Sequence, residues 1–332
     1  MSAIRVGLIG FGGWTRSAYL PALARIDNVR VAAVAALSEA SRLAARETLG
    51  GGVNLFDGYE SLSAQADVDV YMVALPDSLH EDGLAAVLDT GKPVFYEIPI
   101  THTRERTKPA LRLLLSAPQL THADLELGFA PVLARVAEVV GSGQLGALRT
   151  ATLRTQMPWG GMANWDLCTI NHLAPWYVDP LNRVLGSSPD RVLVLDGAGK
   201  PGRMQNQSTG LLDYSGIWGV LQANIDNVGP IETVLEVNGD DGDLVADLFA
   251  AELRLRTRGG PEWIAEQHAD LQPRAAWPGM HECVQAFFAD VERGGTGTAD
   301  ARTVAQLHLV GLAAEESVDS GTWAEVEALE QI

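Results

Sequence analysis

Cysteine and long apolar runs are scarce in this chain of 332 residues. Cys168 and Cys283 are too few for a disulfide framework and lack metal-ligand spacing, so we expect free thiols, no metal ion and a cytoplasmic protein. No apolar run approaches the roughly 20 residues that span a bilayer. Only Arg5 is basic ahead of the first apolar run, so we expect neither a membrane segment nor a signal peptide.

Positively charged residues are also few. The chain carries 24 Lys and Arg against 42 Asp and Glu, a net charge of −18. Binding to a nucleic-acid backbone requires clustered Lys or Arg, and the sequence has no such cluster, so we expect no nucleic-acid partner. Hydrophobic residues make up 47% of the chain, which suits about two globular domains at this length.

Short apolar runs alternate with helical stretches over the first 120 residues. This rhythm predicts a Rossmann-type, doubly wound parallel sheet, in which ligands bind beyond the carboxyl ends of the strands. We place this domain at residues 1–122. The expected strands are Ile4–Ile9, Val29–Ala35, Asn54–Phe56, Val68–Leu75, Val94–Tyr96 and Gln119–Ala123, and the expected helices are Trp14–Ala24, Glu39–Leu49, Tyr59–Ala64, Ser78–Thr90 and Arg104–Leu115.

The pattern of polar and apolar residues changes after this point, and we place a second domain at residues 123–332. Runs of alternating polarity separated by Gly-Asp turns predict an α+β domain with an open, mainly antiparallel sheet. The expected strands are Leu148–Thr155, Arg191–Asp196, Gly210–Tyr214, Ile217–Asn224, Thr233–Asn238, Leu244–Leu248 and Leu253–Thr257, with helices at Pro131–Val140, Met280–Glu292 and Ala301–Ser317.

A glycine cluster follows the first expected strand and opens the first helix: Gly10-Phe11-Gly12-Gly13-Trp14-Thr15. Glycine at the first position allows a tight turn, and glycine at the third lets the backbone approach a pyrophosphate at the helix N-terminus. This loop predicts that the segment from Gly10 to Trp14 binds a dinucleotide, NAD or NADP.

The end of the second strand leaves the choice between these cofactors open. An Asp or Glu there usually binds the NAD ribose, and an Arg the NADP phosphate, but this chain has Ala36 and Leu37. Ser38 could hydrogen-bond the ribose or phosphate, with Arg42 one turn further along. The alternative is that Ser38 is a helix cap and Arg42 a surface residue.

Two further turns complete a recognisable pattern. Leu75-Pro76-Asp77-Ser78-Leu79-His80 closes one strand, and Glu97-Ile98-Pro99 closes the next. Together with the glycine loop, these segments resemble the Gfo/Idh/MocA oxidoreductases, the family of glucose-fructose oxidoreductase and inositol dehydrogenase. The resemblance implies that Leu75, Pro76, His80 and Glu97 border the cofactor and that a cis Pro99 shapes the turn.

The same resemblance extends over most of the chain and carries further expectations. It implies an NAD(P)-dependent oxidoreductase acting on a sugar-like or imine small molecule. It also implies a homodimer or homotetramer that pairs through the C-terminal sheet.

Several residues depart from the family pattern. Ile98 stands where the family carries a lysine beside the nicotinamide, and an isoleucine cannot hold a proton. The segment Gly160–Ile170 resembles a second family signature, in which Asp166 matches but Ile170 occupies the histidine position. Gly128 replaces an arginine that many relatives carry.

Three residues are candidates for the missing proton donor. Asp166 retains the family's aspartate. Tyr96 is two residues from Ile98 on the same strand face, although a buried aromatic is the plainer interpretation. His172 lies about 240° round a helix that starts at Asp166, so it can serve as the base only if the helix starts later.

Two functions remain open at this point. One is an oxidoreductase in which another group handles the proton. The other is a catalytically silent regulator that binds a dinucleotide or metabolite on the same fold. Both predict an intact glycine loop, so dinucleotide binding alone does not separate them.

Overall fold

The structure is a computed structural model that describes residues 3–158, 168–197, 207–266, 271–295 and 297–332. Its contacts divide the chain into two compact units. The first unit comprises Met1–Asp124 and Arg274–Ala305, and the second comprises Leu125–Pro273 and Gln306–Ile332. The first unit therefore includes residues 274–305, from the C-terminal part of the chain. A single domain boundary after residue 122 would place that segment in the second domain.

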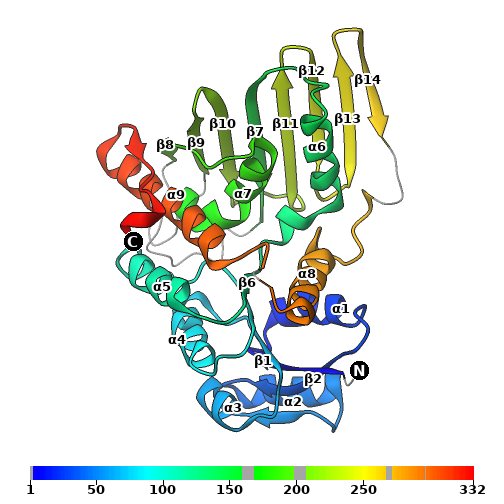
Figure 1. The fold of residues 1–332 in the computed structure, drawn as a ribbon, viewed down its shortest axis with the longest axis vertical. Coiled ribbons are helices and arrows are strands. Elements are labelled where there is room, and N and C mark those ends of the chain that lie inside the picture. The colour runs from blue at the N-terminus through cyan, green and yellow to red at the C-terminus, as the bar shows by residue number, and fades with distance from the viewer. Residues whose placement is uncertain (1–2, 159–167, 198–206, 267–270, 296) are drawn as a thin grey trace. The chain divides into compact units, whose positions relative to one another are not determined.

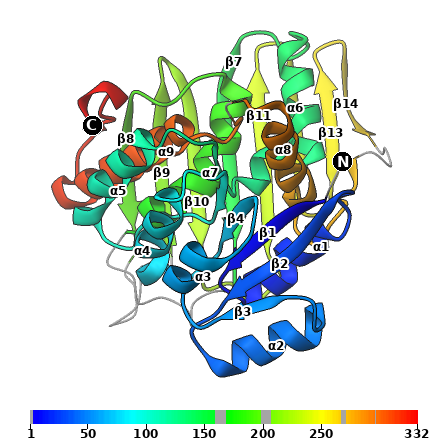
Figure 2. The same ribbon diagram turned by 60° about the horizontal axis from the view of Figure 1, so that its bottom comes forward.

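The first unit is built on a six-stranded parallel sheet in the order β3-β2-β1-β4-β5-β6 (Figures 1 and 2). All four residues of β4 are buried, as expected for a parallel strand covered on both faces. The Rossmann-type, doubly wound fold predicted from the alternating pattern is therefore confirmed. The strands are β1 (Ile4–Ile9), β2 (Val29–Ala35), β3 (Asn54–Phe56), β4 (Val70–Val73), β5 (Val94–Tyr96) and β6 (Thr121–Ala123).

Helices connect these strands. The first crossover begins with a π-helical turn, η1 (Thr15–Tyr19), that continues into α1 (Leu20–Leu23), where the sequence predicted one helix. α8, far along the chain, packs against α1 within this unit. The other helices are α2 (Glu39–Leu49), α3 (Tyr59–Gln65), α4 (Asp77–Leu88), α5 (Arg104–Ser116) and α8 (Met280–Arg293).

The second unit contains a nine-stranded sheet in the order β14-β13-β12-β11-β7-β10-β9-β8-β15. Only the β7–β10 pair is parallel among its described strand pairs, so the expectation of a mainly antiparallel sheet is confirmed. The strands are β7 (Leu148–Gln156), β8 (Arg191–Asp196), β9 (Gln207–Tyr214), β10 (Ile217–Asn224), β11 (Glu232–Gly239), β12 (Gly242–Asp247), β13 (Glu252–Thr257), β14 (Gly260–Glu266) and β15 (Ala324–Glu325).

One face of this sheet is buried and the other is open. Along β7, Ala151, Leu153 and Thr155 are buried, whereas Thr152 and Arg154 between them are partly exposed. α6 and α7 contact the sheet. The helical segments after β6 in chain order, apart from α8, are η2 (Glu126–Phe129), α6 (Pro131–Gly141), α7 (Thr169–Leu185), α9 (Ala301–Ser320) and η4 (Leu329–Gln331). Within the described residues, no helix is both long and apolar enough to cross a membrane.

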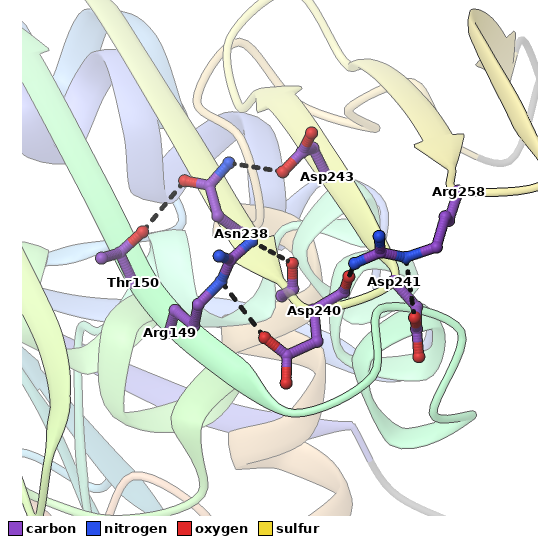
Figure 3. A network of polar contacts seen from close by, with 8 residues as sticks. Arg149, Thr150, Asn238, Asp240, Asp241, Asp243 and Arg258 are labelled. Atoms are coloured by element: carbon purple, nitrogen blue, oxygen red, sulfur yellow. Dashed lines mark hydrogen bonds and ion pairs between the residues drawn. The ribbon is translucent and has the colours of Figure 1, made fainter.

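Ion pairs tie the β11–β12 turn to neighbouring strands (Figure 3). Arg149 Nη2 donates to the carbonyl oxygen of Gly239 at 2.7 Å, and its Nε lies 3.5 Å from Asp240. Arg258 Nε lies 3.3 Å from Asp241 on the other side of the turn. Because these side chains are largely exposed, the pairs contribute little stability and mainly fix the shape of the turn.

Candidate cofactor pocket and reaction site

A cavity of about 400 Å³ lies at the carboxyl edge of the parallel sheet, wholly within the first unit. Segments that follow β1, β2, β4 and β5 form its walls. The lining residues are Ile9, Gly10, Phe11, Gly12, Gly13, Trp14, Ala35, Ala36, Leu37, Ser38, Ser41, Gly58, Tyr59, Ala74, Leu75, Pro76, Leu79 and Glu97.

The glycine loop forms the middle of this pocket. Gly10 has φ +96°, and a Cβ there would overlap the carbonyl oxygen of Ala74, so only glycine fits. A Cβ on Gly12 or Gly13 would meet nothing within 4 Å. The backbone at these two residues thus faces open space beside the start of a helix, which is the shape that a pyrophosphate requires.

The end of β2 forms one side of the pocket. Ser38 caps α2, since its Oγ accepts from the backbone N–H of Ser41 at 3.1 Å and donates to Ser41 Oγ at 2.8 Å. Ser38 also lines the pocket, so the cap and the cofactor contact do not exclude each other. Arg42 Nη1 donates to the carbonyl oxygens of Ala36 at 2.7 Å and Leu37 at 2.9 Å.

Glu97 lies on the opposite side of the pocket, at the end of β5. Its Oε2 accepts a hydrogen bond from Tyr19 Oη at 3.0 Å. Burial, together with the charges of Glu97 and Asp124, raises the pKa of Tyr19 well above its usual value, so the phenol stays protonated. Trp14 Nε1 donates to Asp124 Oδ2 at 3.1 Å.

Trp14 has an aromatic neighbour as well. Its ring centroid lies 4.7 Å from that of Trp277, with the planes inclined at 60°. Both residues belong to the first unit. Trp14 is therefore held by a hydrogen bond and a ring contact, and it lines the pocket as an aromatic side chain.

His80 and Pro99 do not line the pocket but bond to each other. His80 Nδ1 lies 2.8 Å from the carbonyl oxygen of Pro99, which can only accept, so Nδ1 carries the proton. Burial lowers the pKa of His80 to about 4, which leaves it neutral at physiological pH. The peptide bond between Ile98 and Pro99 is cis, as predicted. These two residues support the turn that carries Glu97.

None of the three candidate proton donors is among the residues that line this pocket. Tyr96 is buried, and its hydroxyl has no hydrogen-bond partner among the residues that the structure describes. Desolvation raises its pKa well above the usual value. His172 is in the second unit, buried, with its ring centroid 5.7 Å from that of Trp176. Asp166 lies outside the described residues.

The start of α7 bears on His172. The helix begins at Thr169, capped by Cys168, whose sulfur accepts from the backbone N–H of Asn171 at 3.3 Å. This later start meets the condition under which His172 could act as a base. Its catalytic role stays a prediction.

An arginine from α7 fills the space beside Gly128. A Cβ on Gly128 would overlap Asp179 Oδ2 and Arg183 Nε, which are hydrogen-bonded to each other at 2.7 Å. The guanidinium carbon of Arg183 lies 4.7 Å from the centre of the Phe129 ring. Arg183 could not be predicted as a neighbour of Gly128, because nothing in the local sequence pattern connects the two positions.

A Rossmann sheet with a glycine-lined pocket at its carboxyl edge defines a dinucleotide-binding protein of two units. Residues 4–123 match the family described as "Oxidoreductase family, NAD-binding Rossmann fold". The resemblance of the motifs to the Gfo/Idh/MocA oxidoreductases is thus confirmed for residues 4–123, which carry the NAD-binding Rossmann fold of that family.

The similarity to known proteins covers nearly the whole chain. D-xylose 1-dehydrogenase (NADP(+)) 2 of Haloferax volcanii is 26% identical, over 97% of this chain and 99% of its own. A dTDP-3,4-didehydro-2,6-dideoxy-alpha-D-glucose 3-reductase of Saccharopolyspora spinosa is 29% identical over 90% of both chains. The solved structure of a levoglucosan dehydrogenase in complex with NADH and L-sorbose superposes with a TM-score of 0.85 at 17% identity, covering 99% of this chain and 100% of that one. These relatives are named as enzymes and do not favour the silent regulator.

Proposed function

We propose that this chain is an NAD(P)-dependent dehydrogenase or reductase of a sugar-like small molecule. The observation that carries the proposal is the pocket at the carboxyl edge of the sheet, where the backbone of Gly12 and Gly13 faces open space. The named activities of the relatives support the sugar-like substrate, with an imine as the alternative class.

Each part of the pocket has an expected role toward the dinucleotide. The glycine loop from Gly10 to Gly13 holds the pyrophosphate, and the Ser38 and Ser41 hydroxyls reach the adenosine ribose. Trp14, Leu75, Pro76 and Glu97 face the nicotinamide half, while His80 and Pro99 support the turn beneath it. The nicotinamide, when bound, gives or takes the hydride.

The group that handles the proton must be supplied by the chain, because Ile98 cannot do so. Tyr96, Asp166 and His172 remain the candidates from the sequence. Tyr96 is the weakest of these as a base, since its hydroxyl is buried and its pKa is raised far from neutrality.

We also propose that the protein is cytoplasmic and forms a homodimer or homotetramer through the open face of the second unit's sheet. Leu193, Leu211 and Val220 lie side by side on that face across β8, β9 and β10. Leu195 and Trp218 flank them and are 69% and 40% exposed. Apolar side chains gathered in this way are typical of a protein–protein interface.

The experiment that tests the function is an assay of the purified chain with NAD⁺ or NADP⁺ and a panel of sugars, polyols and cyclic imines. We expect reduced dinucleotide to form with at least one sugar or polyol, and Gly12→Val to abolish the reaction. A native protein that binds dinucleotide but turns over no member of the panel in either direction would favour the regulator instead.

A further inference from the structure

The topology of the first unit fixes which end of the pocket takes which half of the cofactor. β2 and β3 lie on one side of β1, and β4 and β5 lie on the other. The adenosine ribose binds at the end of β2 in this fold, and the pyrophosphate binds at the loop after β1. The nicotinamide therefore belongs on the side of β4 and β5, where Leu75, Pro76 and Glu97 line the pocket.

Few groups at this pocket can exchange a proton. Among its described lining residues, only Tyr59 and Glu97 carry titratable side chains. Tyr59 lies at the start of α3, on the adenosine side. Glu97 is thus the single titratable lining residue on the nicotinamide side of the described pocket, one position before the isoleucine that replaces the family's lysine.

The surroundings of Glu97 suit a carboxylate that takes up and releases a proton. Tyr19 Oη donates to Glu97 Oε2 at 3.0 Å, and a carboxylate has about four lone-pair sites in all, so this bond does not saturate the group. The titratable groups around Tyr19 are Glu97, Asp124 and the thiol of Cys283. Because Tyr19 stays protonated, it holds the Glu97 carboxylate in one orientation without competing for its proton.

We propose that Glu97 is the acid–base group of this enzyme and that Tyr19 positions it; the inference rests on the oxidoreductase function proposed above. In oxidation, the substrate's C–H hydrogen leaves with both electrons for the oxidised nicotinamide, and the O–H proton goes to the Glu97 carboxylate. The electron pair of the O–H bond becomes the second bond of the carbonyl group. Reduction returns the proton from Glu97 to the carbonyl oxygen.

The test compares Glu97→Gln with Glu105→Gln, the same change at an exposed position in the first turn of α5. We expect Glu97→Gln to lower kcat at least about 100-fold, the usual loss on removing an acid–base group, and Glu105→Gln to leave it unchanged. Formate should restore part of the activity of Glu97→Ala, because a small carboxylate can occupy the vacated space.

Two readouts separate proton transfer from a structural role. The oxidised nicotinamide carries a positive charge that the reduced form lacks, so Glu97→Gln should weaken NAD(P)⁺ binding at least threefold relative to NAD(P)H. Tyr19→Phe should move the acidic limb of the kcat profile to higher pH, because the lost hydrogen bond favoured the carboxylate. Tyr71→Phe, a buried hydroxyl loss outside the pocket, should not move this limb.

The possible outcomes are distinct. A Glu97→Gln variant that turns over within threefold of the native protein, with the same pH profile, overturns the role of Glu97 while leaving the proposed function intact. A folded native protein that binds dinucleotide but oxidises or reduces nothing overturns the proposed function, and this inference with it. Loss of activity with a changed affinity ratio and formate rescue supports both.

Discussion

Arg183 occupies the space that a side chain on Gly128 would need. Its Nε and Asp179 Oδ2 both lie where a Cβ at position 128 would fall, and its guanidinium stacks on Phe129. Burial raises the pKa of Asp179, and Arg183 opposes that shift. Gly128, at the position where the family pattern has an arginine, thus leaves room for the Asp179–Arg183 pair.

Gly128→Ala should therefore destabilise the protein by about 2 kcal/mol, because the added carbon displaces the partly buried Asp179–Arg183 ion pair. Urea denaturation measures the effect. Gly141→Ala is the matched control, since a Cβ at the end of α6 meets nothing within 4 Å and alanine favours a helix by about 0.5 kcal/mol or more. Equal stability of Gly128→Ala and the native protein would contradict the geometry described for Arg183.

Gly12→Val should strongly weaken dinucleotide binding, because its branched side chain would fill the open space beside the glycine loop. Titration calorimetry with NAD(H) and NADP(H) should show at least a tenfold loss of affinity. Gly51→Val, in a loop outside the pocket with similar open space, should bind like the native protein. If Gly12→Val binds as tightly as Gly51→Val, the pyrophosphate site has been misplaced.

The native protein should discriminate less than about 100-fold between NAD and NADP, a difference of about 2.7 kcal/mol, because neither an acid nor a free guanidinium stands at the end of β2. Leu37→Asp should shift the preference toward NAD at least tenfold, since a carboxylate there would bind the ribose and repel a phosphate. Leu43→Asp, equally exposed but outside this pocket, is the control. If the native protein preferred one of the two dinucleotides by well over 100-fold, a residue other than those at the end of β2 would have to contact the ribose.

The fold was predictable from the sequence to a large extent. β1, β2, β3, β5, β8 and β10 have the predicted bounds, because apolar alternation and flanking Gly or Asp residues mark them clearly. β14 was missed since nearly all its residues are exposed, so it lacks the alternation that reveals a half-buried strand. β15 was missed because two residues form no pattern; only pairing with β8 defines it.

The site was predictable in part. The glycine loop and the β4 and β5 turns could be found because each is a local motif. The contacts that organise Glu97 could not, because Tyr19 is 78 residues away from it and Trp14 is 110 residues away from Asp124. Tertiary packing creates such pairs, and a single sequence carries no signal of them.

His80 should make the protein lose stability in acid. Its folded pKa of about 4 lies below its ordinary value of 6.5, so its contribution is present above pH 6.5 and is lost as pH falls toward 4. The loss amounts to about 3 kcal/mol at most. Thermal unfolding of native protein and His80→Gln, compared at pH 8 and pH 5, should show a smaller acid destabilisation in the variant. If the unfolding temperatures of the native protein and the variant fall equally between pH 8 and pH 5, groups other than His80 determine the loss of stability in acid.

Leu211→Glu should weaken self-association, because it places a charge in the centre of the apolar row on the open sheet face. Analytical ultracentrifugation should show the native protein as a dimer or tetramer and the variant shifted toward monomer. Val228→Glu, at a fully exposed position in the same unit, should leave the assembly intact. A native monomer at all concentrations would rule out this interface.

The most direct test of the account is the fate of the hydrogen on the substrate carbon. The protein would be incubated with NAD⁺ or NADP⁺ and with sugars and polyols that carry deuterium at the reacting carbon. Mass spectrometry of the recovered dinucleotide would then show whether it has gained deuterium. We predict that one deuterium passes from at least one substrate to the dinucleotide, and that the Gly12→Val protein transfers none. Bound dinucleotide that gains no deuterium from any of these compounds would contradict the assignment as a sugar oxidoreductase.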